Sequence, residues 1–351
     1  MGAGATKMIP CSLACPARGN VARAQICICF CPAGWLLIGT MTATGYRLVQ
    51  LANGVYSVHS LAHRETFHPV VGPSAEAETL YLNQLRLADR FRRAADEFVV
   101  WDVGLGAAAN VLAVLQATQN TPGVLRIVSF DHTLEPLEFA LDHADSLGYF
   151  HGYEKQVGHL LTGPRTRAAG SRASGAVTRL ETTFQKELAT VHWEVYLADF
   201  PGLLQEWERG PAHPESSAAA IPAPPQAILF DAFSPATNPA MWTQSLFADL
   251  FRRLAPSRPC ALATYSRSTL LRVSLLLAGF YVGSGHATGE KEETTIAANS
   301  LSLIDAPLDR RWLSRARRST SAEPLGEPVY RQAPLSVSTR ETLEAHPQFQ
   351  H

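Results

Sequence analysis

Residues Glu97–Ala117 read EFVVWDVGLGAAANVLAVLQA, and this stretch decides the fold class. The apolar run at its start predicts a strand. Gly104 and Gly106 then permit a tight turn and the close approach of a ligand to the backbone. The apolar continuation after the turn predicts a helix. Ala109 occupies the third glycine position of a dinucleotide-binding fingerprint, which weakens a nicotinamide or flavin interpretation.

The strand-to-helix plan recurs along the chain. Further units are predicted in Leu125–Gly148, Val191–Trp207, Gln226–Pro235 and Pro259–Val282, and the last of these leads to a final pair of strands ending near Asn299. Strands that alternate with helices predict an α/β protein with a mostly parallel, doubly wound sheet. In such sheets ligands bind outside the carboxyl ends of the strands.

Four aspartates fall at or near these carboxyl ends: Asp102, Asp131, Asp199 and Asp231. Asp131 lies about 25 residues after the glycine turn, where a carboxylate can accept two hydroxyl hydrogen bonds from a ribose. The carboxylate of Asp199 could accept a hydrogen bond from the amino group of an adenine. Helix capping remains the alternative role for Asp131 and Asp199.

The part of the chain before this sheet carries local signals of its own. Tyr46–Ser60 alternates apolar and polar residues around an Asn-Gly pair at 53–54, which predicts a β-hairpin. Ser74–Phe91 predicts a helix that its first serine can cap. Leu161–Gly175 and Arg209–Pro225 are rich in proline, glycine, alanine and serine, which predicts two loops.

Five of the six cysteines lie within the first 31 residues. Their spacing matches neither a disulfide scaffold nor a zinc site, so we expect no metal. The apolar stretch at residues 24–39, AQICICFCPAGWLLIG, is short for a membrane span of about 20 residues. It is interpreted either as a targeting segment or as sequence upstream of a true start at Met41. We expect a cytoplasmic protein without membrane association.

The charge balance limits the classes of partner. The chain has 30 lysines and arginines against 31 aspartates and glutamates, a formal net charge of −1. This balance argues against a surface built entirely for nucleic acid. Two local arginine groups are either solvated faces or nucleic-acid contacts: Arg86, Arg90, Arg92 and Arg93, and Arg310, Arg311, Arg315, Arg317 and Arg318.

Phe230–Trp242 reads FDAFSPATNPAMW and places Asp231 at the end of an apolar run. Two prolines and an asparagine follow, so the stretch predicts either an ordinary turn or the rigid lip of an active site. The choice between the two interpretations depends on the rest of the chain.

Taken in order, WDVGLGAAAN, VSFDHTLEPL, LADFPGLL, FDAFSPATNPAMW and LATYSRSTLLRVSLLLAGFYV resemble the S-adenosylmethionine-dependent methyltransferases. More narrowly, they resemble the methyltransferase module of the bifunctional tRNA 5-methylaminomethyl-2-thiouridine biosynthesis enzymes, over roughly Tyr46 to Ser300. Ala107 and Ala108 depart from the family's glycine turn. No stretch resembles the flavin oxidase domain of those enzymes, so the resemblance implies a methyltransferase without bound flavin.

The resemblance implies the following roles. Asp102, Gly104, Gly106 and Asn110 would shape the pocket of S-adenosylmethionine, with Asp131 at the ribose and Asp199 at the adenine. Asp231 would be catalytic, orienting an amine and accepting its proton. Substrate-binding roles would fall to the lip and its neighbours: Phe233, Pro235, Asn238, Met241, Trp242, Glu65, His68 and Tyr265.

The function implied is N-methylation of a 5-aminomethyluridine at the tRNA wobble position. Two alternatives remain open: a methyltransferase of the same fold that acts on a small amine or another acceptor, and a degenerate module that only binds the cofactor. The domains expected are an extension over residues 1–40, a hairpin and helix over 41–95, the methyltransferase domain over 96–304, and a poorly ordered tail over 305–351.

Overall fold

The computed structural model of the chain describes residues 45–168, 177–209, 221–289 and 292–350. The predictions for the extension at residues 1–40 lie outside these ranges, as do parts of the two predicted loops. Within the described ranges no helix is long and apolar enough to cross a membrane.

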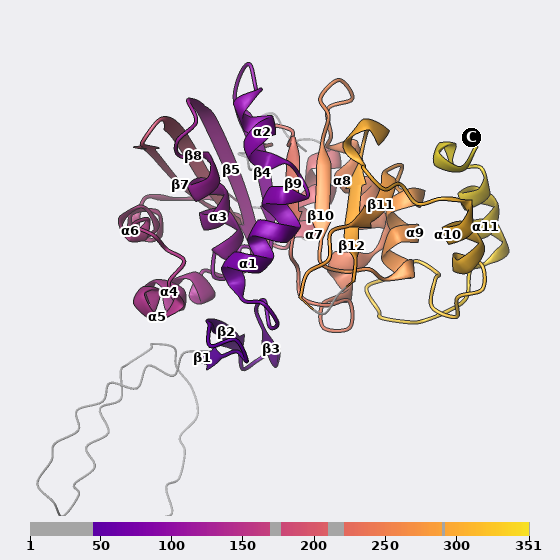
Figure 1. Ribbon diagram of the computed structural model, residues 1–351, viewed down its shortest axis with the longest axis horizontal. Coiled ribbons are helices and arrows are strands. Elements are labelled where there is room, and N and C mark those ends of the chain that lie inside the picture. Colours follow the sequence, from indigo (N-terminus) through magenta and orange to yellow (C-terminus); the bar gives the residue numbers. More distant parts are fainter. Residues whose placement is uncertain (1–44, 169–176, 210–220, 290–291, 351) are drawn as a thin grey trace, which may run out of the picture. The chain divides into compact units, whose positions relative to one another are not determined.

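A nine-stranded sheet forms the centre of the fold, in the order β11-β12-β10-β9-β4-β5-β8-β7-β6 (Figure 1). Its five middle strands are parallel: β8 (Ala189–Leu197), β5 (Gly123–Asp131), β4 (Phe98–Val103), β9 (Ala227–Phe230) and β10 (Ala261–Thr264). Antiparallel strands extend both edges: β12 (Thr294–Ala298) and β11 (Tyr281–Gly285) on one, β7 (Val177–Lys186) and β6 (Arg165–Ala168) on the other. The prediction of a doubly wound, mostly parallel sheet is confirmed.

Helices cover both faces of this sheet. Side chains alternate along β4, so Phe98 and Val100 enter one buried core while Val99, Trp101 and Val103 enter the other. The first core is covered by α1 (Pro73–Ala77), α2 (Leu87–Arg92), α3 (Ala109–Thr118), α4 (Glu135–Asp142), α5 (Ala144–Leu147) and α6 (Glu154–Thr162). The second is covered by α7 (Phe200–Arg209), α8 (Gln244–Arg252), α9 (Thr269–Leu277), α10 (Arg310–Ala316) and α11 (Val337–Glu344).

The predicted N-terminal hairpin is confirmed. β1 (Tyr46–Gln50) pairs antiparallel with β2 (Tyr56–Ser60), and the short β3 (Glu65–Thr66) adds a third strand. The single helix predicted over Ser74–Phe91 is instead broken into α1, a π-helical turn η1 (Glu78–Asn83) and α2. Gly72 precedes α1, and no side chain caps it. The chain leaves the right-handed helical conformation before α2, at Arg86, which is left-handed with φ of 49°.

The expectation of a poorly ordered tail after residue 305 is wrong. α10 and α11 form there, together with a final short helix η4 (Pro347–Phe349). Leu343 and Phe349 are buried in the second core. The overall composition of the tail is polar, but several of its apolar residues, among them Trp312, Leu313 and Leu335, also pack into this core.

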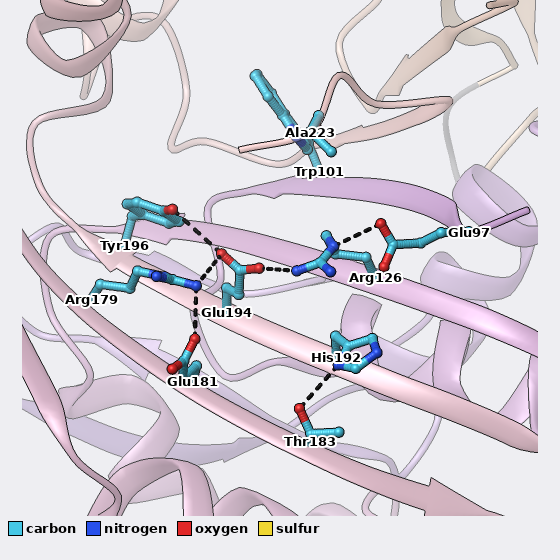
Figure 2. Close-up of polar contacts among 10 residues, drawn as sticks. All are labelled: Glu97, Trp101, Arg126, Arg179, Glu181, Thr183, His192, Glu194, Tyr196 and Ala223. Carbon is cyan, nitrogen blue, oxygen red and sulfur yellow. Dashed lines mark hydrogen bonds and ion pairs between the residues drawn. The ribbon is translucent and has the colours of Figure 1, made fainter. Parts of the chain in front are cut away.

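The two outer strands β6 and β7 were missed by the sequence prediction, and the first predicted loop is therefore partly strand. β7 bears charged side chains that continue a polar network across β8 and β5 (Figure 2). Arg126 on β5 bonds to Glu97 and to Glu194 on β8, and Glu194 also pairs with Arg179 on β7 at 3.1 Å. The edge of the sheet is thus held by charge where the hydrophobic pattern is weak.

Candidate active site

A cavity of about 690 Å³ lies where the strand order reverses, between β4 and β9. Loops after β4, β5, β8 and β9 supply one side, including Gly104–Ala107, Asp131–Thr133, Ala198 and Asp231–Ser234. Residues 63–69, from the β2–β3 turn onward, supply the other. The cavity therefore sits where ligands of doubly wound sheets bind, and it contains most of the site residues predicted from sequence.

The glycine turn after β4 requires its glycines. Gly104 has φ of 98°, and a Cβ added there would lie 2.6 Å from the backbone oxygen of Asp231. Gly106 has φ of 50° and borders the ring of Phe67. The turn is pinned by the Gly104 amide, which donates to the Phe130 carbonyl at 3.0 Å. The loops after β4 and β9 thus approach so closely that no side chain fits at Gly104, which lines the cavity.

Asp131 lines the cavity beside this turn. Its Oδ2 accepts a hydrogen bond from the Gly106 amide at 2.9 Å, and its Oδ1 accepts one from the His132 amide at 2.7 Å. Burial raises the pKa of Asp131, and these backbone donors oppose the rise. Leu134, not Asp131, is the N-cap of α4. The capping alternative therefore gives way to a carboxylate that is fixed at the cavity wall.

The other two predicted cofactor carboxylates do not line the cavity. Asp199 lies between two lining residues, but its Oδ2 accepts a hydrogen bond from the Gly202 amide at 2.8 Å, as the capping alternative expects. Asp102 is fully buried behind the glycine turn. Burial raises its pKa to about 8, the Ser129 side chain opposes the rise, and Asp231 and Asp131 add to it.

Asn110, at the start of α3, connects the cofactor side of the cavity to Asp231. Its Nδ2 donates to Asp231 Oδ2 at 2.7 Å. Its Oδ1 is buried and has no hydrogen-bond partner among the described residues. Because an unpaired buried acceptor is costly, Asn110 Oδ1 is suited to a donor on a bound ligand.

Asp231 is also approached from the N-terminal segment. His68 Nε2 lies 3.8 Å from Asp231 Oδ2, and His68 Nδ1 lies 3.8 Å from Glu76 Oε2. All three side chains are at most 15% exposed. His68 has a left-handed backbone with φ of 47°, an uncommon conformation for a residue with a Cβ. The imidazole of His68 therefore lies between two carboxylates, those of Glu76 and Asp231.

The lip after β9 is held by hydrogen bonds from three directions. Trp242 Nε1 donates to the Phe233 carbonyl at 2.8 Å, and the Tyr265 hydroxyl donates to the Ala232 carbonyl at 3.0 Å. Glu65 accepts from the Ser234 hydroxyl at 2.8 Å and from the Thr237 hydroxyl. This stretch is thus a rigid wall and not merely an ordinary turn.

The predicted lip residues divide into lining and supporting groups. Phe233, Asn238, Met241 and Tyr265 line the cavity, as do Glu65 and His68. Trp242 is fully buried and acts through its hydrogen bond to the lip. Pro235 instead lines a separate cavity of about 70 Å³ next to the C-terminal segment.

Sequence reasoning missed Glu76 and Phe67 as site residues. Glu76 falls within the helix predicted over Ser74–Phe91, yet this residue, only 6% exposed, lines the cavity beside His68. Phe67 follows β3 and contacts the ring of Phe233 with centroids 5.7 Å apart. The available signal was the cluster of polar and aromatic residues in RETFHP. Their contact with the segment after β9 depends on the tertiary structure, which the sequence pattern does not show.

Comparison with known proteins bears on this geometry. Residues 184–300 match a family model described as S-adenosyl-L-methionine-dependent methyltransferase. The matched region is that of an S-adenosylmethionine-dependent methyltransferase. The enzyme class and the cofactor predicted from sequence are confirmed.

Curated relatives carry one name. The methyltransferase is similar to the tRNA 5-methylaminomethyl-2-thiouridine biosynthesis bifunctional protein MnmC of Ectopseudomonas mendocina, with 36% identity over 96 residues, 27% of this chain and 14% of that protein. The protein of the same name from Aeromonas hydrophila is 29% identical over 231 residues, 62% of this chain and 30% of that protein. The matches thus span less than a third of the length of these relatives.

A solved structure extends the likeness of the fold. MnmC2 of Aquifex aeolicus has a TM-score of 0.56 and 19% identity, covering 87% of this chain and 85% of that one. This likeness supports the assignment of the fold, with the cavity at the same reversal of strand order as in other doubly wound sheets.

The residues of the cavity fit S-adenosylmethionine. Bare backbone at Gly104 and Gly106 leaves room for close approach, and Asp131 presents a fixed carboxylate to a diol. Phe130, Ala198 and Phe200 provide apolar walls for a purine. Within the described ranges, no group of three or more His, Cys, Asp or Glu side chains is arranged to hold a metal ion.

Proposed function

We propose that the methyltransferase acts on the primary amine of a 5-aminomethyluridine at the wobble position of a tRNA, in the cytoplasm. The observation that carries this proposal is Asp231, which Asn110 orients toward a cavity walled by a rigid lip. The curated relatives are named as tRNA 5-methylaminomethyl-2-thiouridine biosynthesis proteins, which supports tRNA as the substrate.

The electrostatics of the cavity favour a cationic group. Four carboxylates line it: Glu65, Glu76, Asp131 and Asp231. Burial raises the pKa of Tyr265 well above its usual value, and three of these carboxylates, Asp231, Glu65 and Glu76, raise it further. A primary ammonium would be attracted to the same field.

The bound cofactor would supply the methyl group, and the chain would prepare the amine. An alkyl ammonium must lose a proton before its nitrogen can attack, since amines of this kind are mostly protonated near neutral pH. Asp231 would accept a hydrogen bond from the amine and orient its lone pair. His68, between Asp231 and Glu76, would offer a path for the proton away from the nitrogen.

The balance of the reaction follows from this arrangement. A nitrogen–carbon bond would form as the carbon–sulfur bond breaks. The bonding pair would stay on sulfur, which leaves as a neutral thioether, and the product would be released as a secondary ammonium ion. The lip would hold the nucleotide so that nitrogen, methyl carbon and sulfur stay in line. Its wall is fixed by Trp242, Tyr265 and Glu65, so alignment would require little further ordering.

The proposal is tested with labelled S-adenosylmethionine and tRNA from cells that lack the 5-methylaminomethyl modification. We expect label at the wobble uridine, and a fall of at least about a hundred-fold in kcat for Asp231→Ala. Asp231→Asn preserves the size of the side chain and its contact with Asn110, and should lose activity while still binding the cofactor.

Two results would contradict the proposal. Cofactor binding without any label on tRNA would exclude this substrate and favour a small amine acceptor. Activity of Asp231→Asn equal to that of the parent chain would exclude a proton-accepting role for Asp231.

A further inference from the structure

One part of the cavity lining takes no part in the proton transfer proposed above. It comprises His63, Arg64, Phe67 and Phe233, which all line the cavity and are here called the aromatic rim. His63 and Arg64 belong to the turn Leu61–Arg64 between β2 and β3 and are exposed. Leu61, in the same turn, is 48% exposed.

The rings of this rim are already arranged against one another. His63 lies 4.3 Å from Phe233 between ring centroids with an interplanar angle of 31°, and Phe67 lies 5.7 Å from Phe233. Phe233 is fixed from behind because its carbonyl accepts the Trp242 hydrogen bond. Rings from two distant chain segments thus form a partly exposed aromatic surface.

Arg64 provides the charge that the rest of the cavity lacks. Four carboxylates line the interior, and Arg64 is the one lysine or arginine among the described lining residues. Within the described residues no carboxylate forms an ion pair with Arg64. A polyanion that enters this acidic cavity would be repelled unless a cation stood at the mouth.

We infer that the aromatic rim is the RNA-contacting edge of the site, where a nucleobase stacks on His63 and Phe233 and a backbone phosphate pairs with Arg64. This inference rests on the proposed tRNA substrate. Enzymes that modify a base take it out of its stack, and aromatic side chains then replace the lost neighbours. Arginine suits the phosphate because its guanidinium presents two parallel donors.

The first test compares Arg64→Ala with Arg167→Ala in the full chain. Arg167 is an exposed arginine on the edge strand β6 and lies outside the cavity lining, so it is a matched control for charge. For Arg64→Ala we expect a rise of roughly ten-fold in the KM for tRNA, with S-adenosylmethionine affinity unchanged. The slope of log KM against log salt should fall by about 0.7, as for one lost contact to single-stranded phosphate.

The second test separates stacking from charge. His63→Ala should raise the KM for tRNA several-fold, whereas His63→Phe should restore it, because a phenyl ring keeps a face for the base. Neither variant should alter the affinity for S-adenosylmethionine. A role of His63 limited to folding would instead lower the melting temperature of both variants and leave the KM of the folded protein unchanged.

The outcomes distinguish the inference from the proposed function. If the parent chain methylates tRNA and Arg64→Ala matches Arg167→Ala in KM and salt slope, the aromatic rim is not the RNA contact although the tRNA substrate stands. If the parent chain binds S-adenosylmethionine but methylates no tRNA, the proposed function fails, and the inference fails with it.

Discussion

At the scale of single residues, the site depends on Gly104 and Asp102. A side chain at Gly104 or a charge on Asp102 is unfavourable in the folded chain. Gly104 gives the glycine turn its contact with β9, since its Cα faces the Asp231 carbonyl at a distance that admits no further atom. Asp102 lies directly behind that turn, fully buried, and pairs in register with Ser129 on β5. Gly104 lines the cavity, whereas Asp102 does not.

Replacing Gly104 by alanine should weaken cofactor binding strongly. The added Cβ would lie 2.6 Å from backbone, which must then shift, and φ of 98° is unfavourable for alanine. We expect a loss of at least about ten-fold in S-adenosylmethionine affinity by calorimetry and a lower melting temperature. Gly148→Ala is the matched control, because Gly148 shares a positive φ of 70° but has open space around its Cα. Equal effects of both changes on affinity would mean that strain alone, and not the approach of β9, matters.

Asp102 should make stability depend on pH. Its pKa is raised by burial to about 8 in the folded chain, far above the value of an unfolded aspartate, so between about pH 4 and pH 8 the folded state binds more protons. Stability contributed by this group therefore falls as the pH rises through that window, by up to about 1.4 kcal/mol per pH unit. Asp102→Asn should thus gain melting temperature over the parent chain at pH 8 relative to pH 5. A difference that does not change with pH would contradict the assigned pKa.

At the scale of elements, the sheet is held in two different ways. Its middle strands are buried on both faces by apolar side chains. From Leu180 onward β7 instead alternates buried or half-buried with exposed residues, and charge pairs supplement its antiparallel ladder with β8 (Figure 2). This difference explains what the sequence could predict. The apolar runs of β4, β5, β9 and β10 stand out in the sequence, but β7 reads as polar and gains its register only from β8.

Glu194 is the centre of that polar network. Its side chain is 7% exposed and bonds to Arg126 and to Arg179. Glu194→Gln would leave two guanidinium groups facing a neutral amide, and we expect the free energy of unfolding to fall by about 1–3 kcal/mol. This is less than for a fully buried pair, because the arginines are 27% and 31% exposed. Glu181→Gln, at a position 58% exposed on the same network, should change it by less than about 0.5 kcal/mol. Chemical denaturation measures both values, and equal losses would contradict a central role for Glu194.

At the scale of the whole molecule, the site combines local and distant information. The glycine turn, Asp131 and the Asp231 lip were predictable because each is contiguous in sequence and follows a strand. The line Glu76–His68–Asp231 was not, because it requires the N-terminal segment to fold over β9. Asp199 had two possible roles in the sequence, and its hydrogen bond to Gly202 agrees with capping. The prediction of a poorly ordered tail was wrong because composition does not show that residues such as Leu343 and Phe349 pack into the second core.

The C-terminal segment also closes an open margin of the sheet. β11 is the last strand on its side, and an edge strand normally leaves backbone groups that can pair with another molecule. Here the Gln348 amide imitates a neighbouring strand, since its Oε1 accepts from the Val282 amide and its Nε2 donates to the Val282 carbonyl, both at 2.8 Å. The Ser284 amide donates to the Ala306 carbonyl at 2.9 Å, and the Leu308 amide adds a second donor to Val282. The final fifty residues thereby act as a guard against intermolecular β-pairing, so the same segment that completes the second core also protects the enzyme from aggregation through this edge.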